Sequence, residues 1–309
     1  MRRIARRDFC AGALGAVAMT GLGLPGADAA PSLAPMVRRP IPKSGELLPV
    51  VGVGTWQTFD VGNDADDRVR LGQVLETLFG AGGTVIDTSP MYRRAEGVVG
   101  DLLARAGTRG KAFLATKVWT DGEAAGRGQM EQSLRRLRTD RIELMQVHNL
   151  VDWRIQLRTM RAWREAGRFR YLGITHYTPS AFDELEHVLR AEPLDFLQIP
   201  YSITVTEAES RLLPLARDLG VAVIANRPFE GGDLFGRTRG RPLPGFAPEI
   251  DCGSWAQFFL KYILGHDAMT CVIPGTDRVD HMADNAGAGR GRMPDTVTRK
   301  RMVDFLTRL

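Results

Sequence analysis

Four residues that could move or stabilise a proton lie at or just after the ends of apolar runs. Asp87, Lys117 and His148 each end such a run, and Tyr92 follows Asp87 by five positions. A tyrosine hydroxyl, with a pKa of about 10, is a poor acid at neutral pH unless a neighbouring cation stabilises the phenolate that remains. Lys117 can be that cation, and Asp87 can compensate for the burial of its charge. With His148 to orient a substrate oxygen, these residues fit a site that donates a proton as negative charge develops on that oxygen.

Each of these residues also has a structural explanation. Alone, Asp87 could cap a turn, Tyr92 could be an amphipathic surface residue, and His148 could be a hydrogen-bonded core histidine. Lys117 is more informative, because the chain has only five lysines and this one ends a strongly apolar run. Four such residues near the ends of successive runs favour a functional site over four unrelated structural roles.

The segments between these residues predict an α/β fold. From about residue 50, short β-branched runs alternate with amphipathic stretches, which is typical of repeated β/α units and a parallel sheet. Eight strands favour a closed (β/α)8 TIM barrel, in which active sites lie at the carboxyl ends of the strands. We interpret the Pro- and Gly-rich residues 230–248 as a long loop over the barrel mouth. The expected strands are residues 50–55, 85–89, 112–118, 143–148, 171–176, 196–202, 222–228 and 271–276, and the clearest expected helices are residues 66–79, 126–137, 155–166 and 180–190.

The first thirty residues have the features of a twin-arginine signal peptide. Arg6 and Arg7 form the arginine pair, residues 11–24 are mildly apolar, and small residues around Ala29 offer a cleavage site. A disordered basic tail is the alternative. The signal predicts an interaction with the twin-arginine export machinery, a periplasmic or exported protein after cleavage near Ala29, and no stable membrane span. The predicted organisation is a signal peptide at residues 1–30, an N-terminal linker at 31–46 and the barrel at 47–309.

Composition excludes several classes of protein. The formal net charge of the 309-residue chain is +5, and part of it belongs to the leader, so nucleic-acid binding is not supported. Two cysteines remain beyond the leader, which implies no disulfide framework. The five histidines show none of the close spacings of metal motifs, so no metal site is expected. A dinucleotide site of the Rossmann type is also unsupported, because Gly52 and Gly54 are not followed by a third glycine that opens a helix.

Several motifs resemble those of the aldo/keto reductase family. They are Val53-Gly54-Thr55-Trp56, residues 85–89 with Tyr92, residues 115–119 and residues 147–149, and the similarity extends from about residue 48 to residue 285. The resemblance implies a barrel that reduces an aldehyde or ketone with NAD(P)H. It also implies that Tyr92 is the general acid and that Asp87, Lys117 and His148 complete a catalytic tetrad.

The same resemblance implies where the nicotinamide of the cofactor lies. Thr175 and His176 occupy the positions of the family's Ser/Asn pair that holds the carboxamide, and Gln198 matches a Gln with the same role. Asn226 stands where many relatives place an aromatic residue against the nicotinamide ring, so a stacking surface must come from elsewhere. Arg227 beside it could contribute through its planar guanidinium, contact the pyrophosphate or be a surface residue.

At the adenosine end of the cofactor, the resemblance implicates Thr276, Arg278, Asp284 and Asn285. Relatives that prefer NADPH often bind its 2′-phosphate with a Lys and an Arg whose positions hold other residues here. Arg278 is then the best phosphate partner, because a guanidinium can bind phosphate through two hydrogen bonds. Asp277 beside Arg278 would oppose the same anion, so the expectation of NADPH ahead of NADH rests on the family resemblance alone.

The substrate is the least specified part of the prediction. Trp56 and Trp119 follow predicted strand ends and could line an apolar pocket, with packing in the core as the alternative. A small-molecule aldehyde or ketone is expected, and no loop identifies the compound. A binding protein is the second hypothesis: because free NADPH is not expected outside the cytoplasm, an exported barrel could hold a dinucleotide as a redox sensor or partner-binding subunit with little turnover. A hydrolase is not favoured, since the four residues include neither paired carboxylates nor a Ser/His arrangement.

Overall fold

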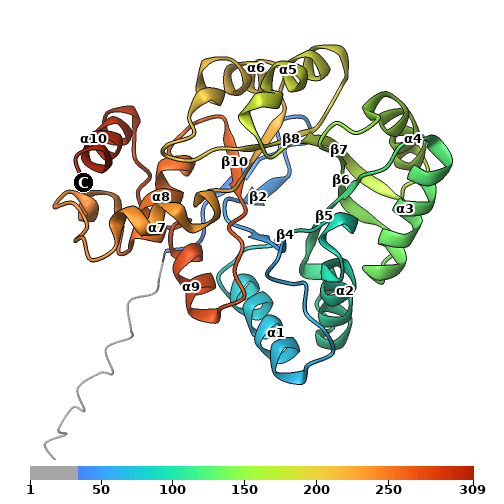
Figure 1. Cartoon of the computed structure of the whole chain (residues 1–309), viewed down its shortest axis with the longest axis horizontal. Coiled ribbons are helices and arrows are strands. Elements are labelled where there is room, and N and C mark those ends of the chain that lie inside the picture. The colour runs from blue at the N-terminus through green and yellow to red at the C-terminus, as the bar shows by residue number, and fades with distance from the viewer. Residues whose placement is uncertain (1–33) are drawn as a thin grey trace, which may run out of the picture. The chain divides into compact units, whose positions relative to one another are not determined.

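Eight short strands form one parallel sheet that closes into a barrel. The computed structural model describes residues 34–309, and each barrel strand pairs with the next one in the chain. Val51 and Gly54 bridge to Val272 and Gly275, which joins the first barrel strand to the last. The (β/α)8 TIM barrel predicted from the sequence is confirmed (Figure 1). Its strands are β3 (Val53–Gly54), β4 (Val85–Asp87), β5 (Phe113–Val118), β6 (Ile142–His148), β7 (Phe169–Thr175), β8 (Phe196–Pro200), β9 (Ala222–Asn226) and β10 (Met269–Val272).

Helices alternate with the strands and surround the barrel (Figure 1). Local sequence signals begin several of them: Asp64 caps α1 by accepting two backbone N–H groups, and Ser254 caps α8 by accepting one. The four helices expected from apolar periodicity form with ends shifted by at most three residues. The helices are α1 (Ala65–Gly80), α2 (Ala95–Ala106), α3 (Glu123–Arg136), α4 (Trp153–Glu165), α5 (Phe182–Ala191), α6 (Leu212–Asp218), α7 (Asp233–Thr238), α8 (Trp255–Leu264), α9 (Val279–Gly287) and α10 (Thr296–Thr307).

The apolar core has two layers, because successive residues of a strand face opposite sides of the sheet. One layer lies between the sheet and the helices. The other fills the barrel interior and includes Val85, Phe113, Leu144, Tyr171 and Phe196. These five residues lie at or near the starts of their strands. Several inward positions nearer the carboxyl ends carry buried polar side chains instead.

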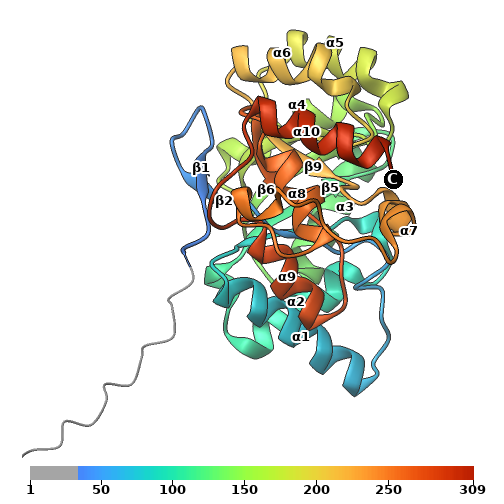
Figure 2. The same ribbon diagram turned by 90° about the vertical axis from the view of Figure 1, so that its left-hand side faces the viewer.

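A hairpin closes the amino-terminal end of the barrel. Its strands β1 (Arg38–Pro40) and β2 (Leu47–Pro49) pair antiparallel, and it lies on the left of the barrel in Figure 2. Ile41 and Leu48 are buried and belong to the cluster inside the barrel. Residues 38–40 lie within the segment expected to be a linker, and they form a strand because the apolar residues of this hairpin are needed to close the core.

The Pro- and Gly-rich segment after β9 contains more structure than the expected loop. A 3-10 turn at Glu230–Gly232 leads directly into α7. Gly231 and Gly232 have φ angles of 75° and 109°, a left-handed conformation that glycine adopts without strain. In Figure 2, α7 lies at the opposite end of the barrel from the β1–β2 hairpin.

The expected signal peptide, with Arg6, Arg7 and the cleavage position near Ala29, lies outside the described residues. Within residues 34–309, no helix is long and apolar enough to cross a membrane. In the same part of the chain, no three His, Cys, Asp or Glu side chains are placed together so that they could hold a metal ion.

Candidate active site

The barrel brings the four expected catalytic residues to its carboxyl end. Asp87 and His148 are the last residues of β4 and β6, Lys117 is the last but one of β5, and Tyr92 ends the 3-10 turn Pro90–Tyr92. Asp87, Lys117 and His148 are buried, while Tyr92 is half-buried. Parallel strands all end at the same side of a barrel, so residues far apart in the chain form one site.

Lys117 is a fully buried cation held by two acceptors. Its Nζ donates to Asp87 Oδ2 at 2.7 Å and to the backbone carbonyl oxygen of Thr88 at 2.8 Å. Burial lowers the pKa of Lys117, but its interactions with Asp87 and Tyr92 outweigh burial and raise the pKa above its usual value. The ammonium is therefore protonated at neutral pH, and its charge is compensated as a buried charge must be.

Tyr92 lies beside this cation. The Lys117 Nζ is 5.0 Å from the centroid of the Tyr92 ring. Burial raises the pKa of the Tyr92 hydroxyl, and the positive charge of Lys117 offsets part of the rise. Lys117 lowers the pKa of Tyr92 as expected, but burial raises this pKa by more. The hydroxyl consequently keeps its proton at neutral pH, and the cation lowers the free energy needed to release it.

His148 completes this group as a neutral imidazole. Its Nδ1 lies 3.1 Å from Ser89 Oγ, and its ring packs edge-on against Tyr92 with 5.8 Å between the centroids. Burial, followed by the charges of Lys117 and His176, lowers the pKa of His148 to about 2. A neutral imidazole donates through one ring nitrogen and accepts through the other. His148 can therefore hydrogen-bond a substrate oxygen without being the acid that protonates it.

Hydrogen bonds join the residues expected to hold the nicotinamide to Asp87, one of the four expected catalytic residues. Thr175 Oγ1 donates to Gln198 Oε1 at 3.0 Å, and Gln198 Nε2 donates to Asp87 Oδ1 at 2.8 Å. Asn226 Nδ2 donates to the backbone carbonyl oxygen of His176 at 3.0 Å. Asn226 Oδ1 is buried and has no hydrogen-bond partner among residues 34–309, so it can accept an amide N–H. These residues fit a carboxamide, which carries both a donor and an acceptor.

An aromatic surface that Asn226 cannot provide is available close by. Tyr177, which was not among the expected site residues, stacks on the His176 ring with 5.3 Å between centroids and 4° between planes. Its side chain is half exposed. The sequence signal for it is an aromatic residue directly after Thr175, the last residue of β7, and His176. Tyr177 and His176 therefore offer a planar surface at the carboxyl end of the barrel.

Two further polar residues of the site follow from strand periodicity, although neither was expected from the sequence. Gln146 precedes His148 by two residues, and its Nε2 is 3.4 Å from Asp87 Oδ1. Ser89 follows Asp87 by two residues and contacts His148. Alternate residues of an extended chain face the same side, so both side chains point with the catalytic residues. Gly173 leaves room for Gln146, since a Cβ there would lie 3.3 Å from Gln146 Cγ and 2.8 Å from the Phe196 carbonyl oxygen.

The charged residues expected at the adenosine end are engaged with other protein groups. The Arg278 guanidinium pairs with Asp280 at 2.6 Å. Thr276 Oγ1 accepts the backbone N–H of Arg278 at 3.1 Å. Asp284 accepts the hydroxyl of Ser254, the residue that caps α8, at 2.7 Å. Binding a phosphate at Arg278 thus requires competition with Asp280.

The remaining expected residues differ in their exposure. Asn285 is buried within α9, whereas Arg227 follows β9 with an exposed side chain and a φ of 51°. Trp56 and Trp119 are 50% and 40% exposed, so neither is a core residue. The Trp119 ring lies 6.5 Å from the His148 ring, between centroids, which places it beside the catalytic group.

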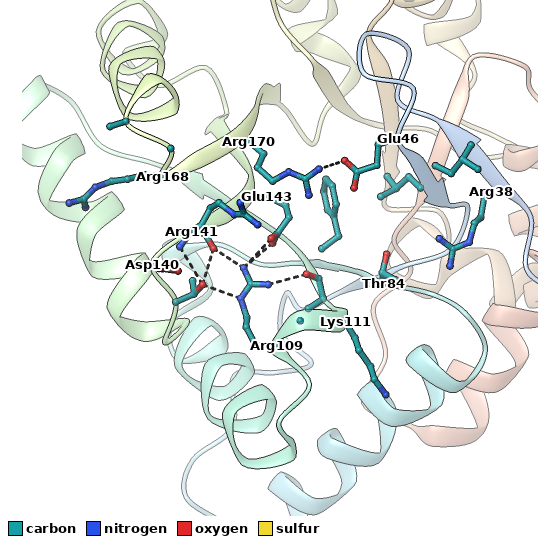
Figure 3. A pocket seen from close by; sticks show the side chains of 18 residues that line it. Arg38, Glu46, Thr84, Arg109, Lys111, Asp140, Arg141, Glu143, Arg168 and Arg170 are labelled. Atoms are coloured by element: carbon teal, nitrogen blue, oxygen red, sulfur yellow. Dashed lines mark hydrogen bonds and ion pairs between the residues drawn. The ribbon is translucent and has the colours of Figure 1, made fainter.

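A cleft of about 810 Å³ lies at the amino-terminal end of the barrel, and none of the expected site residues lines it. Arg109 occupies its centre (Figure 3), where the guanidinium donates to two backbone carbonyl groups at 3.0 and 2.7 Å and pairs with Glu143 at 3.0 Å. Lys111 and Arg168 point away from Arg109 in different directions (Figure 3). Arg109 therefore ties together the segments below the strands, and the groups suited to chemistry lie at the other end.

Comparison with known proteins identifies the family. The model of the aldo/keto reductase family matches residues 50–300. Aldo-keto reductase YhdN of Bacillus subtilis is 31% identical over 202 residues, which cover 60% of this chain and 60% of YhdN. Methylglyoxal reductase YeaE of Escherichia coli is 29% identical over 259 residues, which cover 81% of this chain and 89% of YeaE. The holo form of aldo-keto reductase AKR11C1 from Bacillus halodurans has a TM-score of 0.71 at 24% identity, and covers 88% of this chain and 96% of its own.

The chain belongs to the aldo/keto reductase family of oxidoreductases. The family resemblance inferred from the motifs around Asp87, Lys117 and His148 is thereby confirmed, and the solved structures show the same fold.

Proposed function

We propose that the protein reduces a small aldehyde or ketone to an alcohol with NADPH, and that Tyr92 donates the proton. The buried Lys117–Asp87 pair, with its ammonium 5.0 Å from the centroid of the Tyr92 ring, carries this proposal. A buried cation at this place favours any state in which negative charge builds up on the Tyr92 oxygen. Membership of the family supplies the class of reaction.

The side chains of this chain divide the work of the reaction. When bound, the dinucleotide supplies the hydride that reaches the carbonyl carbon. Thr175, Gln198 and Asn226 hold its carboxamide. Gln198 also donates to Asp87 at 2.8 Å, so the carboxamide site and the catalytic group share one hydrogen-bonded network. Tyr92 and His148 hydrogen-bond the carbonyl oxygen, and Tyr92 transfers its proton as that oxygen gains charge, while Lys117 stabilises the phenolate.

The relatives support the cofactor and the substrate class. An aldo/keto reductase of Klebsiella pneumoniae was crystallised in complex with NADP and acetate, and YeaE is named a methylglyoxal reductase. We extend NADPH to this chain, with weaker use of NADH, and short carbonyl compounds such as methylglyoxal as the first substrates to examine. Trp119, beside His148, and Trp56 would bound the pocket that receives them.

The test compares the wild type with Tyr92→Phe on a panel of short aldehydes and ketones, with NADPH oxidation followed by absorbance. Loss of a general acid is expected to lower kcat/KM by about 10² to 10⁴-fold. NADPH binding, measured by fluorescence, should not change. Equal activity of the two proteins would refute the role of Tyr92. Wild-type oxidation that stops after one equivalent of NADPH would favour the second hypothesis, a redox sensor or partner-binding subunit that holds its dinucleotide.

We also propose that the protein is exported by the twin-arginine machinery and is periplasmic or extracellular after cleavage near Ala29. The order of the Arg6-Arg7 pair, the apolar stretch and the small residues supports this proposal. Replacing both arginines with lysine should leave the protein in the cytoplasmic fraction, and mass spectrometry of the exported wild type should find its N-terminus close to Ala29. An unchanged distribution of the double variant would overturn the proposal.

A further inference from the structure

Ser89 is a fully buried serine in contact with the catalytic histidine. It lies between β4 and the 3-10 turn that carries Tyr92, and its backbone is extended. Its Oγ is 3.1 Å from His148 Nδ1 and accepts the backbone N–H of Met91 at 3.2 Å. The position of the hydroxyl is therefore fixed from two sides.

The hydrogen atoms around Ser89 can be counted. A serine hydroxyl has one hydrogen to donate and two lone pairs, and the Met91 N–H uses one lone pair. If His148 carried its proton on Nδ1, Ser89 would accept two hydrogen bonds, and the structure gives its own buried hydrogen no other acceptor among residues 34–309. An unsatisfied buried donor is unfavourable. If Ser89 instead donates to Nδ1, both residues are satisfied.

We propose that Ser89 is a positioning residue that fixes His148 in the tautomer with its proton on Nε2. This inference rests on the proposed function and goes beyond it, because it explains how a neutral histidine presents a donor to the substrate rather than a lone pair. The opposite tautomer would direct a lone pair at the carbonyl oxygen, and the two would repel each other.

The aromatic side chains around His148 pack against its ring but do not set its tautomer. The ring packs edge-on against Tyr92 and at 59° to Trp119, with centroids 5.8 and 6.5 Å away. These aromatic faces restrict the orientation of the ring without binding its nitrogen atoms. Among residues 34–309, Ser89 is the hydrogen-bond partner that the structure gives to the imidazole. Deleting the hydroxyl should therefore release both tautomers.

The experiment reads the tautomer directly from the nitrogen chemical shifts of histidine in the ¹⁵N-labelled protein, with the His148 signals assigned from the spectrum of His148→Gln. In the wild type we expect a protonated Nε2 and an unprotonated Nδ1. In Ser89→Ala we expect averaged shifts from a mixture of tautomers. Ser89→Thr keeps a hydroxyl and should restore the wild-type shifts. Ser133→Ala is the matched control, because it makes the same change at another fully buried serine, on α3.

Kinetics provide the second measurement. Ser89→Ala should lower kcat by about tenfold, which corresponds to one hydrogen bond, with KM changed less than about threefold. Ser89 also caps the turn that carries Tyr92, and loss of the cap alone would lower kcat without changing the His148 tautomer.

Two results would overturn the inference: a wild-type protein with its proton on Nδ1, or a Ser89→Ala protein with the wild-type tautomer. The wild-type spectrum tests the tautomer even if Ser89→Ala fails to fold. An enzyme that reduces no carbonyl compound would refute the proposed function while leaving the tautomer to be read.

Discussion

The two ends of the barrel each hold a buried or partly buried ion pair, and the pairs differ in how completely the cation is used. At the amino-terminal end, Arg109 pairs with Glu143 and also donates to Thr139 Oγ1 and two backbone carbonyl groups. At the carboxyl end, the structure gives Lys117 two acceptors for its three N–H groups, and its Nζ lies 5.0 Å from the centroid of the Tyr92 ring. Arg109, whose five N–H groups meet four protein acceptors, holds separate segments of the fold together. Lys117 keeps an N–H group that can stabilise negative charge on Tyr92, which is why we place the chemistry at the end of the barrel opposite the cleft.

The largest effect is expected from Lys117→Met. The side chains of Lys117 and Asp87 are 0% and 3% exposed, so the variant leaves a carboxylate buried without its cation. Breaking such a pair costs about 3–5 kcal/mol. We expect the free energy of unfolding, measured with urea and circular dichroism, to fall by that amount. Carbonyl reduction should fall by more than about 10²-fold, because Tyr92 loses its cation.

A double variant separates stability from function at the same position. Replacing both members, as Asp87→Asn with Lys117→Met, removes the uncompensated buried charge, and the new amide oxygen can still accept the N–H of Gln198 that Asp87 accepts. The double variant should therefore regain most of the lost unfolding free energy and none of the activity. Recovery of activity together with stability would show that the pair is only structural.

Arg109→Met should have a smaller effect on stability and none on chemistry. The side chains of Arg109 and Glu143 are 26% and 8% exposed, so water can replace some of the hydrogen bonds that the guanidinium donates. We expect the free energy of unfolding to fall by about 2 kcal/mol. The kcat/KM of the folded protein should stay within about twofold of the wild type. A large loss of activity at wild-type stability would contradict the assignment of a structural role to the amino-terminal end and of chemistry to the carboxyl end.

Stability should depend on pH through the burial of His148. Burial and the charge of Lys117 lower the pKa of His148 to about 2, whereas an unfolded histidine has a pKa of about 6.5. As pH falls below about 6.5, the unfolded chain gains a proton at His148 that the folded protein does not, so stability falls by on the order of 1 kcal/mol per pH unit. His148→Gln lacks this effect, and the difference in unfolding free energy between wild type and variant should shrink from pH 7 to pH 5. A constant difference would show that His148 titrates normally in the fold.

The sequence was sufficient to predict the barrel, because the alternation of β-branched and amphipathic runs is a local property. It also predicted one site from Asp87, Tyr92, Lys117 and His148, because polar residues are unusual near the ends of apolar runs, and the structure brings the four together. The partners that hold these residues were harder to predict. Ser89 and Thr88 act on His148 and Lys117 across distances that depend on strand register, and register is a property of the folded barrel.

Dependence on the folded structure also explains why two connecting segments differ from the sequence prediction. Residues 38–40 look like a polar linker, and they form a strand only because Ile41 and Leu48 enter the barrel from below. The sequence makes Arg278 the best candidate to bind the 2′-phosphate. Its pairing with Asp280 depends on how the chain turns at the start of α9. The first difference comes from long-range packing, and the second comes from the conformation of a local turn.

The smallest effect is expected at the exposed Arg278–Asp280 pair, whose side chains are 58% and 64% exposed. Asp280→Asn removes the carboxylate that competes with a phosphate for the guanidinium, so NADPH should bind several-fold more tightly while NADH binding and stability stay unchanged. Asp183→Asn is the matched control, because it removes the carboxylate of another exposed pair, with Arg211. Fluorescence titration with both cofactors provides the measurement. If Asp280→Asn changes the affinities for NADPH and NADH equally, Arg278 does not bind the 2′-phosphate. The cation that binds it must then come from another part of the carboxyl end.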